Sequence, residues 1–294
     1  HDCGWQTDFV FSVPEDFRSG VYAVKLRCGD SQENLPFFVR PPRGTRQATA
    51  VVLLPTFTYM VYANYARGNV DDDLHKRNAR WGSRPWIPDE HPEYGLSTYN
   101  RHHDGSGICF ASRLRPNLLL RCGYSAIDDP RGSGLRNFPA DTHLIDWLEA
   151  KGHEYDIITD EDLHAEGVDL ISGYNVVMTG SHPEYQTTET MDALEAYTAN
   201  GGRLMYLGGN GFYWKLGTSP EQPGLLEIRR AETGMRAWAA EPGEYFNALD
   251  GGYGGLWLRN GRPPQRLVGV GFSGEGPFWG KPYQRAAAAE DPRV

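Results

Sequence analysis

The sequence predicts an α/β protein built on a doubly wound parallel sheet and preceded by a few strands of a β-sandwich. Three observations support this fold class. Short, largely apolar runs, as in strands buried on both faces, occur at residues 50–54, 155–158, 174–178 and 203–207. Two stretches with helical spacing of apolar residues, 141–151 and 188–200, alternate with these runs, which implies parallel strands with helices on both faces. Residues 8–40 instead alternate as the strands of a sandwich do.

The N-terminal residues are expected to form a separate β unit. Its three strand-like segments, separated by glycine turn signals, are 8–11, 21–26 and 36–39. A linker, Pro-Pro-Arg-Gly at 41–44, then divides the chain into the end of a β-sandwich region at 1–42 and an α/β domain at 43–294. Because the chain begins at His1 rather than Met and its first residues resemble the interior of a longer protein, we expect a fragment or a trimmed subunit.

The two helices have recognisable ends. Asp141 is the expected N-cap of the first helix, and Gly152 is its expected end. The glycine pair that begins at Gly201 ends the second helix. By contrast, residues 66–140 have weak periodicity, and a long excursion of this kind is usually a functional loop or a subunit contact.

Composition and charge exclude several classes of protein. The net charge is −9, and no long run of lysine or arginine occurs, which argues against nucleic-acid and membrane-surface partners. No stretch of about 18 apolar residues could span a membrane, and no secretion signal is visible, so we expect a cytoplasmic protein. The four cysteines are expected to be buried thiols, although 3 with 28, or 109 with 122, could form bridges.

The carboxyl ends of the predicted strands are where a doubly wound sheet binds its ligands. Three segments follow strands at this edge: 55–64, 179–185 and 208–212. We therefore expect the chemistry to come from side chains in these segments.

The second of these segments contains an imidazole and a carboxylate two residues apart, at His182 and Glu184. Both can face one pocket and suit metal ligation, with one group orienting or donating to the other. The structural alternative is that Glu184 caps the helix that starts near Thr187 while His182 is a surface residue.

The third segment, Gly208 to Gly211, allows the backbone to approach a ligand closely. Asn210 offers both a donor and an acceptor to an amide or carboxyl group. Its structural alternative is a tight turn with this residue in the left-handed conformation. The segment is not a dinucleotide fingerprint, because no Gly-x-Gly-x-x-Gly opens a helix.

Aromatic residues and histidines supply further candidates. Tyr59, Tyr62 and Tyr65 follow the first strand, where packing is the usual role and a tyrosinate needs a strong Lewis acid such as ferric iron. His103 lies in the pair 102–103 within the long excursion and could join a metal site. Asp71 to Asp73 is expected to be a solvated acidic turn.

Two nucleophile signatures are absent from the sequence. There is no Gly-x-Ser-x-Gly elbow, and no cysteine lies in a predicted strand-to-helix turn. A covalent thiol mechanism is therefore not expected.

Several segments together resemble the large subunit of N,N-dimethylformamidase and its relatives. The most specific are 179–185 (TGSHPEY) and 201–214 (GGRLMYLGGNGFYW). The segment 54–64 resembles the same family, and 19–41 is similar to the sandwich strands that precede its catalytic domain. The similarity covers most of 8–294 and is weakest in the long excursion.

The resemblance implies a glutamine-amidotransferase-like catalytic domain without the cysteine nucleophile. It also implies a mononuclear, non-haem iron bound by two tyrosines and one glutamate, of which the first tyrosine falls on Tyr62 and the glutamate on Glu184. The second tyrosine falls on His103, with Tyr99 as the second choice. A Tyr/His/Glu set would also suit zinc, which is the alternative metal.

His182 and Asn210 match residues that line the family's site, which implies that they position the substrate or stabilise the developing oxyanion. An acidic residue that the family uses as base falls beyond Val294. The resemblance thus implies a metal-dependent amidohydrolase acting on a small amide, in an oligomer that can include other subunits. One alternative is a non-catalytic subunit that keeps the fold and binds carbohydrate or a partner. Another is an amidotransferase-like enzyme that uses Cys109 or Cys122.

Overall fold

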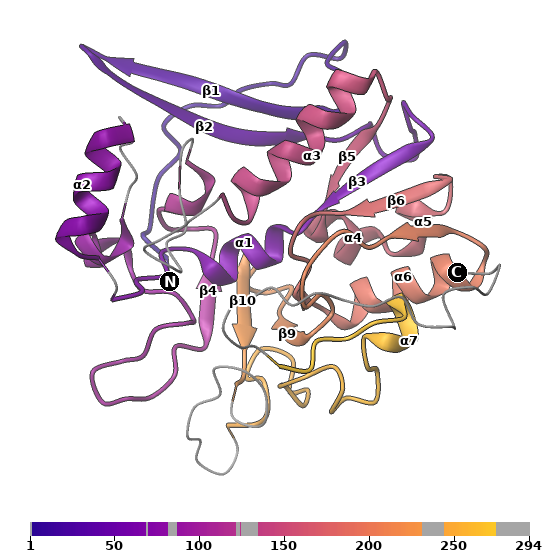
Figure 1. Ribbon diagram of the computed structural model, residues 1–294. Helices are drawn as coiled ribbons and strands as arrows, with labels where there is room; N and C mark the ends of the chain where they lie inside the picture. The colour runs from indigo at the N-terminus through magenta and orange to yellow at the C-terminus, as the bar shows by residue number, and fades with distance from the viewer. Residues whose placement is uncertain are drawn as a thin grey trace, which may run out of the picture.

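The computed structural model describes residues 2–68, 70–81, 87–121, 124, 135–230 and 244–274. Its central element is a four-stranded sheet in which every neighbouring pair is parallel (Figure 1). In spatial order, β5-β3-β6-β8, the strands are Asp156–Thr159, Ala50–Leu54, Val176–Thr179 and Arg203–Met205. The parallel pairing expected for these four segments is therefore confirmed, and the last strand ends two residues earlier than expected.

Helices cover both faces of this sheet. The alternation of side chains in β3 separates two cores: Val52 and Leu54 belong to one, and Val51 and Leu53 to the other. α3 (Phe138–Lys151) packs into the first core. The second core contains residues of α4 (Asp160–Glu166), α5 (Val168–Ile171) and α6 (Thr188–Ala199). The likeness to glutamine amidotransferases stays a prediction.

One end of α3 differs from the expected one. α3 begins at Phe138, three residues before Asp141, so Asp141 is not its N-cap. The carboxylate of Asp141 instead accepts hydrogen bonds from the Tyr59 hydroxyl and the Ser181 amide. α3 ends at Gly152 in the left-handed conformation, as expected.

The N-terminal region is a single hairpin. β1 (Gly20–Cys28) pairs antiparallel with β2 (Ser31–Val39) in a sheet of their own, whereas the expected strand at 8–11 is not formed in this structure. Ser19 ties the base of the hairpin to the central sheet, because its Oγ accepts from the Ile157 amide at 2.8 Å. The boundary between 1–42 and 43–294 stays a prediction.

A second four-stranded sheet was not expected from the sequence. Its order is β4-β10-β9-β7, with β7 and β9 parallel and the other pairs antiparallel. The strands are Phe110–Ser112, Leu225–Ile228, Trp214–Thr218 and Tyr185–Gln186. α1 (Thr56–Tyr62) contacts both β4 and β7, so this helix joins the second sheet to β3 (Figure 1).

The remaining elements lie outside the two four-stranded sheets. They are α2 (Asp72–Trp81), η1 (Pro88–Glu90), η2 (Pro92–Tyr94), η3 (Leu118–Leu120) and α7 (Gln265–Val268). The acidic run at 71–73 therefore opens a helix, since the Asp71 carboxylate accepts from the Leu74 amide at 2.8 Å. In the described part of the chain, every helix is too short or too polar to cross a membrane.

The cysteines were expected to be buried. Cys3 and Cys28 are exposed and unpaired, which corrects that expectation for two of the four. Cys109 is partly buried and free, while Cys122 lies outside the described residues. Burial raises the pKa of the Cys109 thiol, which does not suit a thiolate nucleophile.

Candidate functional site

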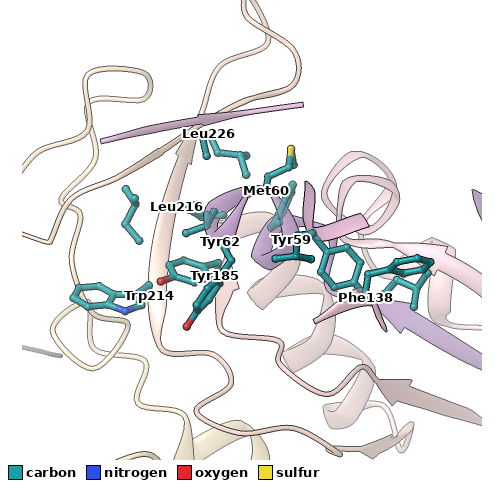
Figure 2. Close-up of a cluster of buried hydrophobic side chains, with 14 of the residues drawn as sticks. Tyr59, Met60, Tyr62, Phe138, Tyr185, Trp214, Leu216 and Leu226 are labelled. Atoms are coloured by element: carbon teal, nitrogen blue, oxygen red, sulfur yellow. The ribbon is translucent and has the colours of Figure 1, made fainter. Parts of the chain in front are cut away.

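Tyr62 is brought to the carboxyl edge of the sheet by α1. β3 leads through Pro55 directly into this helix, and all seven of its residues are buried. Tyr62 is the last residue of the helix and lies in the same apolar cluster as Tyr185 and Trp214 (Figure 2). The turn from a buried strand into a buried helix therefore places a phenol inside the protein.

Glu184 lies in the loop after β6, and only 3% of its surface is exposed. Its Oε2 accepts a hydrogen bond from the Tyr62 hydroxyl at 2.8 Å and another from His182 Nε2 at 2.8 Å. A carboxylate can only accept, so the proton of the imidazole is on Nε2 when that bond forms. Thr187, not Glu184, caps α6 through a capping box. The helix-cap alternative for Glu184 is therefore wrong.

Tyr99 reaches the same carboxylate from the long excursion. Its hydroxyl is 3.3 Å from both oxygens of Glu184, and its ring stacks on Tyr62 with centroids 4.2 Å apart. The loop is held to the end of α1, because Ser97 Oγ and Thr98 Oγ1 both donate to the Val61 carbonyl.

His103 lies elsewhere. It is exposed in a turn closed by the bridge between Arg101 and Gly107. The structure therefore brings Tyr62, Tyr99 and Glu184 together but not His103, contrary to our expectation. Tyr99, the second choice for this position, lies four residues earlier in the same loop, whose sequence has no periodicity that could distinguish the two.

The glycine loop packs against the segment that carries His182. A Cβ at Gly208 would lie 2.5 Å from Pro183 Cδ, and one at Gly211 would lie 3.0 Å from Pro183 Cγ. These glycines thus permit close approach of two backbone segments. Asn210 has φ of 32°, the left-handed turn conformation of its structural alternative, and its role toward a substrate stays a prediction.

Burial and neighbouring charges shift the acidity of the cluster. Burial, then the charge of Glu184, raises the pKa of both Tyr62 and Tyr99. Burial alone would raise the pKa of Glu184 too, but the hydrogen bond and charge of His182, the charge of Arg230 and the Tyr62 hydrogen bond together hold that pKa below its ordinary value. Without a metal, the cluster therefore consists of an ionised Glu184 carboxylate hydrogen-bonded to two neutral phenols.

Two residues of this region were not foreseen. Tyr185 forms a short hydrogen bond between its hydroxyl and that of Tyr99. Arg230, just beyond β10, is fully buried and donates from Nη2 to the Tyr185 hydroxyl at 2.6 Å. Tyr185 was visible in the 179–185 motif, whereas no sequence signal marked a lone arginine after a short strand.

The donor set of the cluster fits one metal ion. The phenol oxygens of Tyr62 and Tyr99 lie 2.8 and 3.3 Å from carboxylate oxygens of Glu184. Ligands about 2.0–2.2 Å from one ion are about 2.8–3.1 Å apart at right angles and about 3.3–3.6 Å apart at tetrahedral angles. In the described residues no group of three His, Cys, Asp or Glu side chains could hold a metal, so any site here depends on the tyrosines.

A cavity of about 630 Å³ lies beside another part of α1. Phe57 and Met60 of that helix line it, together with residues of β9 and β10 such as Leu216 and Leu226. Tyr62, Tyr99 and Glu184 are not among the lining residues, so this cavity is separate from the cluster.

Fold and cluster define an α/β domain with a buried, oxygen-rich site at the carboxyl edge of its parallel sheet. The chain belongs to the family described as N,N-dimethylformamidase beta subunit-like, C-terminal, which matches residues 1–293.

Two curated relatives support this assignment. The N,N-dimethylformamidase beta subunit of Paracoccus aminophilus is 44% identical over 286 residues, and that of Alcaligenes sp is 43% identical over 286 residues. Each alignment covers 94% of this chain and 36% of the relative. The chain therefore spans about a third of the length of these relatives. Both are named beta subunits, and the label "large subunit" that we expected is not part of those names.

Proposed function

We propose that this chain provides the metal site of a metal-dependent amide hydrolase of the N,N-dimethylformamidase type, acting on a small amide. The observation that carries the proposal is the convergence of the Tyr62 and Tyr99 hydroxyls on the Glu184 carboxylate. Membership of a family named for an amidase supports the reaction class.

Tyr62, Tyr99 and Glu184 would hold the metal, in place of the set with His103. Three hard oxygen donors favour a mononuclear, non-haem iron in its ferric state over zinc, which prefers nitrogen and sulfur ligands. When bound, the metal would supply Lewis acidity to the amide carbonyl and a site for the attacking water.

His182 is placed to handle protons at this site. Its Nε2 is 2.8 Å from Glu184 Oε2 and 3.3 Å from the Tyr62 hydroxyl, and its side chain is 12% exposed. A partly accessible imidazole can hold a proton close to a reacting carbonyl. Asn210 lies in the loop that packs against the His182 segment. Its amide would orient the substrate or donate to the developing oxyanion.

The overall reaction is hydrolysis of a linear amide. The carbonyl carbon gains a bond to the water oxygen and loses its bond to nitrogen, and the nitrogen leaves as an amine after it gains a proton. The relatives are named as subunits, so we also propose that this chain acts in an assembly with other chains. We place it in the larger of those subunits, on a glutamine-amidotransferase-like fold.

Elemental analysis and an absorption spectrum of the purified protein test the proposal, together with amine release from N,N-dimethylformamide. We expect about one iron per chain, a visible tyrosinate-to-iron charge-transfer band, and release of dimethylamine. A folded protein that binds neither iron nor zinc after incubation with their salts would overturn the metal site. Bound metal without amine release from the full assembly would instead favour the non-catalytic binding subunit.

A further inference from the structure

Arg230 is a fully buried cation beside the tyrosine cluster. Its guanidinium lies 4.3 Å from the ring centroid of Tyr99, 5.0 Å from that of Trp214 and 5.2 Å from that of Tyr185. Its Nη2 donates to the hydroxyls of Tyr185 and Thr98, at 2.6 and 3.2 Å. Aromatic faces stabilise a desolvated guanidinium and fix its plane.

Burying the Arg230 guanidinium at this position costs folding free energy. Within the described residues, Nε and Nη1 of Arg230 have no hydrogen-bond partner. A buried donor without a partner costs about 1–3 kcal/mol. A fold that keeps such a group, rather than an apolar side chain of similar volume, indicates a role beyond packing.

The hydrogen bonds from Arg230 to Glu184 have one consistent direction. A guanidinium only donates, so the Tyr185 oxygen accepts from Arg230 and its own proton is free to be donated. A carboxylate only accepts, so the Tyr99 hydroxyl donates to Glu184. The remaining bond, between the two hydroxyls, must then run from Tyr185 to Tyr99.

We propose that Arg230 and Tyr185 are positioning residues that form an oriented hydrogen-bond relay, which fixes the Tyr99 oxygen as a metal ligand and donates to it. This inference rests on the proposed function, since it assumes that Tyr99 binds the metal. If Tyr99 coordinated as a phenolate and released its proton to solvent, its hydrogen bond to Glu184 would be lost but the bond from Tyr185 would remain. The positive charge of Arg230 polarises the Tyr185 hydroxyl and strengthens that donation.

The relay also fixes the ligand in space. Thr98 accepts from Arg230 while it donates to the Val61 carbonyl, one residue before Tyr62. Arg230 therefore links three segments that carry or flank the proposed ligands: α1, the loop at 97–100 and β7. Partners of this kind orient metal ligands and commonly change metal affinity by 10–100-fold when removed.

Tyr185→Phe is the sharpest test, because it keeps the ring and removes only the relay hydroxyl. We expect iron affinity, measured by chelator competition, to fall roughly 10–100-fold. We also expect the charge-transfer band to move to longer wavelength, because a phenolate without its hydrogen-bond donor releases its electrons more easily. Arg230→Met should act in the same direction, and Arg230→Lys should restore part of the affinity because it keeps a charged donor.

Tyr197→Phe is the matched control. Its hydroxyl donates to the Tyr174 carbonyl at 3.0 Å, and its ring packs in the core on the other face of the sheet. It should lose a buried hydrogen bond without changing metal affinity or the band. Unchanged affinity and band in Tyr185→Phe would overturn the relay while leaving the metal site standing. A wild-type protein without metal would instead overturn the proposed function itself.

Discussion

The rings of Tyr62 and Tyr99 stack with centroids 4.2 Å apart and an interplanar angle of 29°, and both hydroxyls donate to Glu184. One tyrosine ends a helix that follows directly on β3, and the other lies in an irregular loop. The stack has a chemical consequence, because it holds two phenol oxygens on one side of a single carboxylate.

Tyr99→Phe tests whether this stack is the metal site. The variant keeps the ring on Tyr62 but removes one proposed ligand oxygen, so we expect at least a tenfold loss of iron affinity and loss of part of the visible band. Elemental analysis after dialysis, with an absorption spectrum, measures both. Hydrolysis of N,N-dimethylformamide should fall at least as much.

His103→Ala is the control for Tyr99→Phe, since the resemblance assigned the same ligand to His103. Its side chain is exposed in the turn at 101–107, so metal content and activity should stay within about twofold of wild type. Loss of metal in His103→Ala with retention in Tyr99→Phe would show that His103, not Tyr99, is the third ligand.

Glu184→Gln addresses the central ligand. An amide of the same shape cannot supply the negative charge that a cation requires, so we expect bound metal and amide hydrolysis to be lost. The melting temperature should fall in metal-loaded samples, because bound metal stabilises the folded state by mass action. In samples without metal, the wild type and the variant should differ less.

Thr187→Ala is the control for Glu184→Gln, because it weakens the helix that follows Glu184 without removing a proposed ligand. Thr187 Oγ1 accepts from the Thr190 amide at 3.3 Å in the capping box of α6. Loss of this cap should cost about 1 kcal/mol of unfolding free energy while leaving the metal content intact. If Glu184→Gln keeps the metal as Thr187→Ala does, Glu184 is not a ligand.

The central sheet could be predicted from the sequence because each strand is a short apolar run next to a helical pattern. β3 and β6 are of this kind, and their burial on both faces removes the need for alternation. The second sheet could not be predicted, since β7 has two residues and β4 has three. No periodicity can be read from so few positions.

The candidate site could be predicted for those residues whose segments follow a strand of the central sheet. Glu184 lies in the loop after β6, and Tyr62 ends the helix that follows β3, so both segments start from the same edge of the sheet. Tyr99 and Arg230 depend on how irregular segments fold back, which is decided by contacts such as the stack on Tyr62. Sequence spacing contains no information on such contacts.

Gly208→Ala tests the close approach of the glycine loop to the His182 segment. The new Cβ would lie 2.5 Å from Pro183 Cδ and 2.8 Å from the Ser181 carbonyl oxygen, so one of the two loops must move. We expect a loss of about 1–3 kcal/mol in unfolding free energy and a fall in activity, because the displaced segment carries His182. Gly209→Ala is the control, since its Cβ would meet nothing closer than 3.9 Å. Equal effects in the two variants would contradict this explanation.

Asp160 links the stability of the fold to pH. It is fully buried at the start of α4, and its Oδ2 accepts from the Phe57 amide at 3.2 Å. Burial, then the neighbouring charge of Glu161, raises its pKa well above the ordinary value, and the buried Asp141 acts in the same direction.

The sign of the effect follows from that direction. The stabilising contribution of a carboxyl with a raised pKa is fully present below the pKa of the unfolded chain, about 3.9, and is lost as the pH rises through the folded pKa. The unfolded chain releases the proton first, so wild-type stability falls with pH in this window, by at most about 1.4 kcal/mol per pH unit from this residue.

Asp160→Asn removes this dependence while keeping an oxygen that can accept from Phe57. In samples stripped of metal, we expect the melting temperature of the variant minus that of wild type to increase steadily as the pH rises from 4 toward 7. Thermal unfolding followed by circular dichroism at half-unit steps measures this difference. Asp169→Asn, at an exposed aspartate of α5, controls for the loss of one negative charge. A difference for Asp160→Asn that stays constant with pH would show that the buried carboxyl does not titrate differently in the folded and unfolded states.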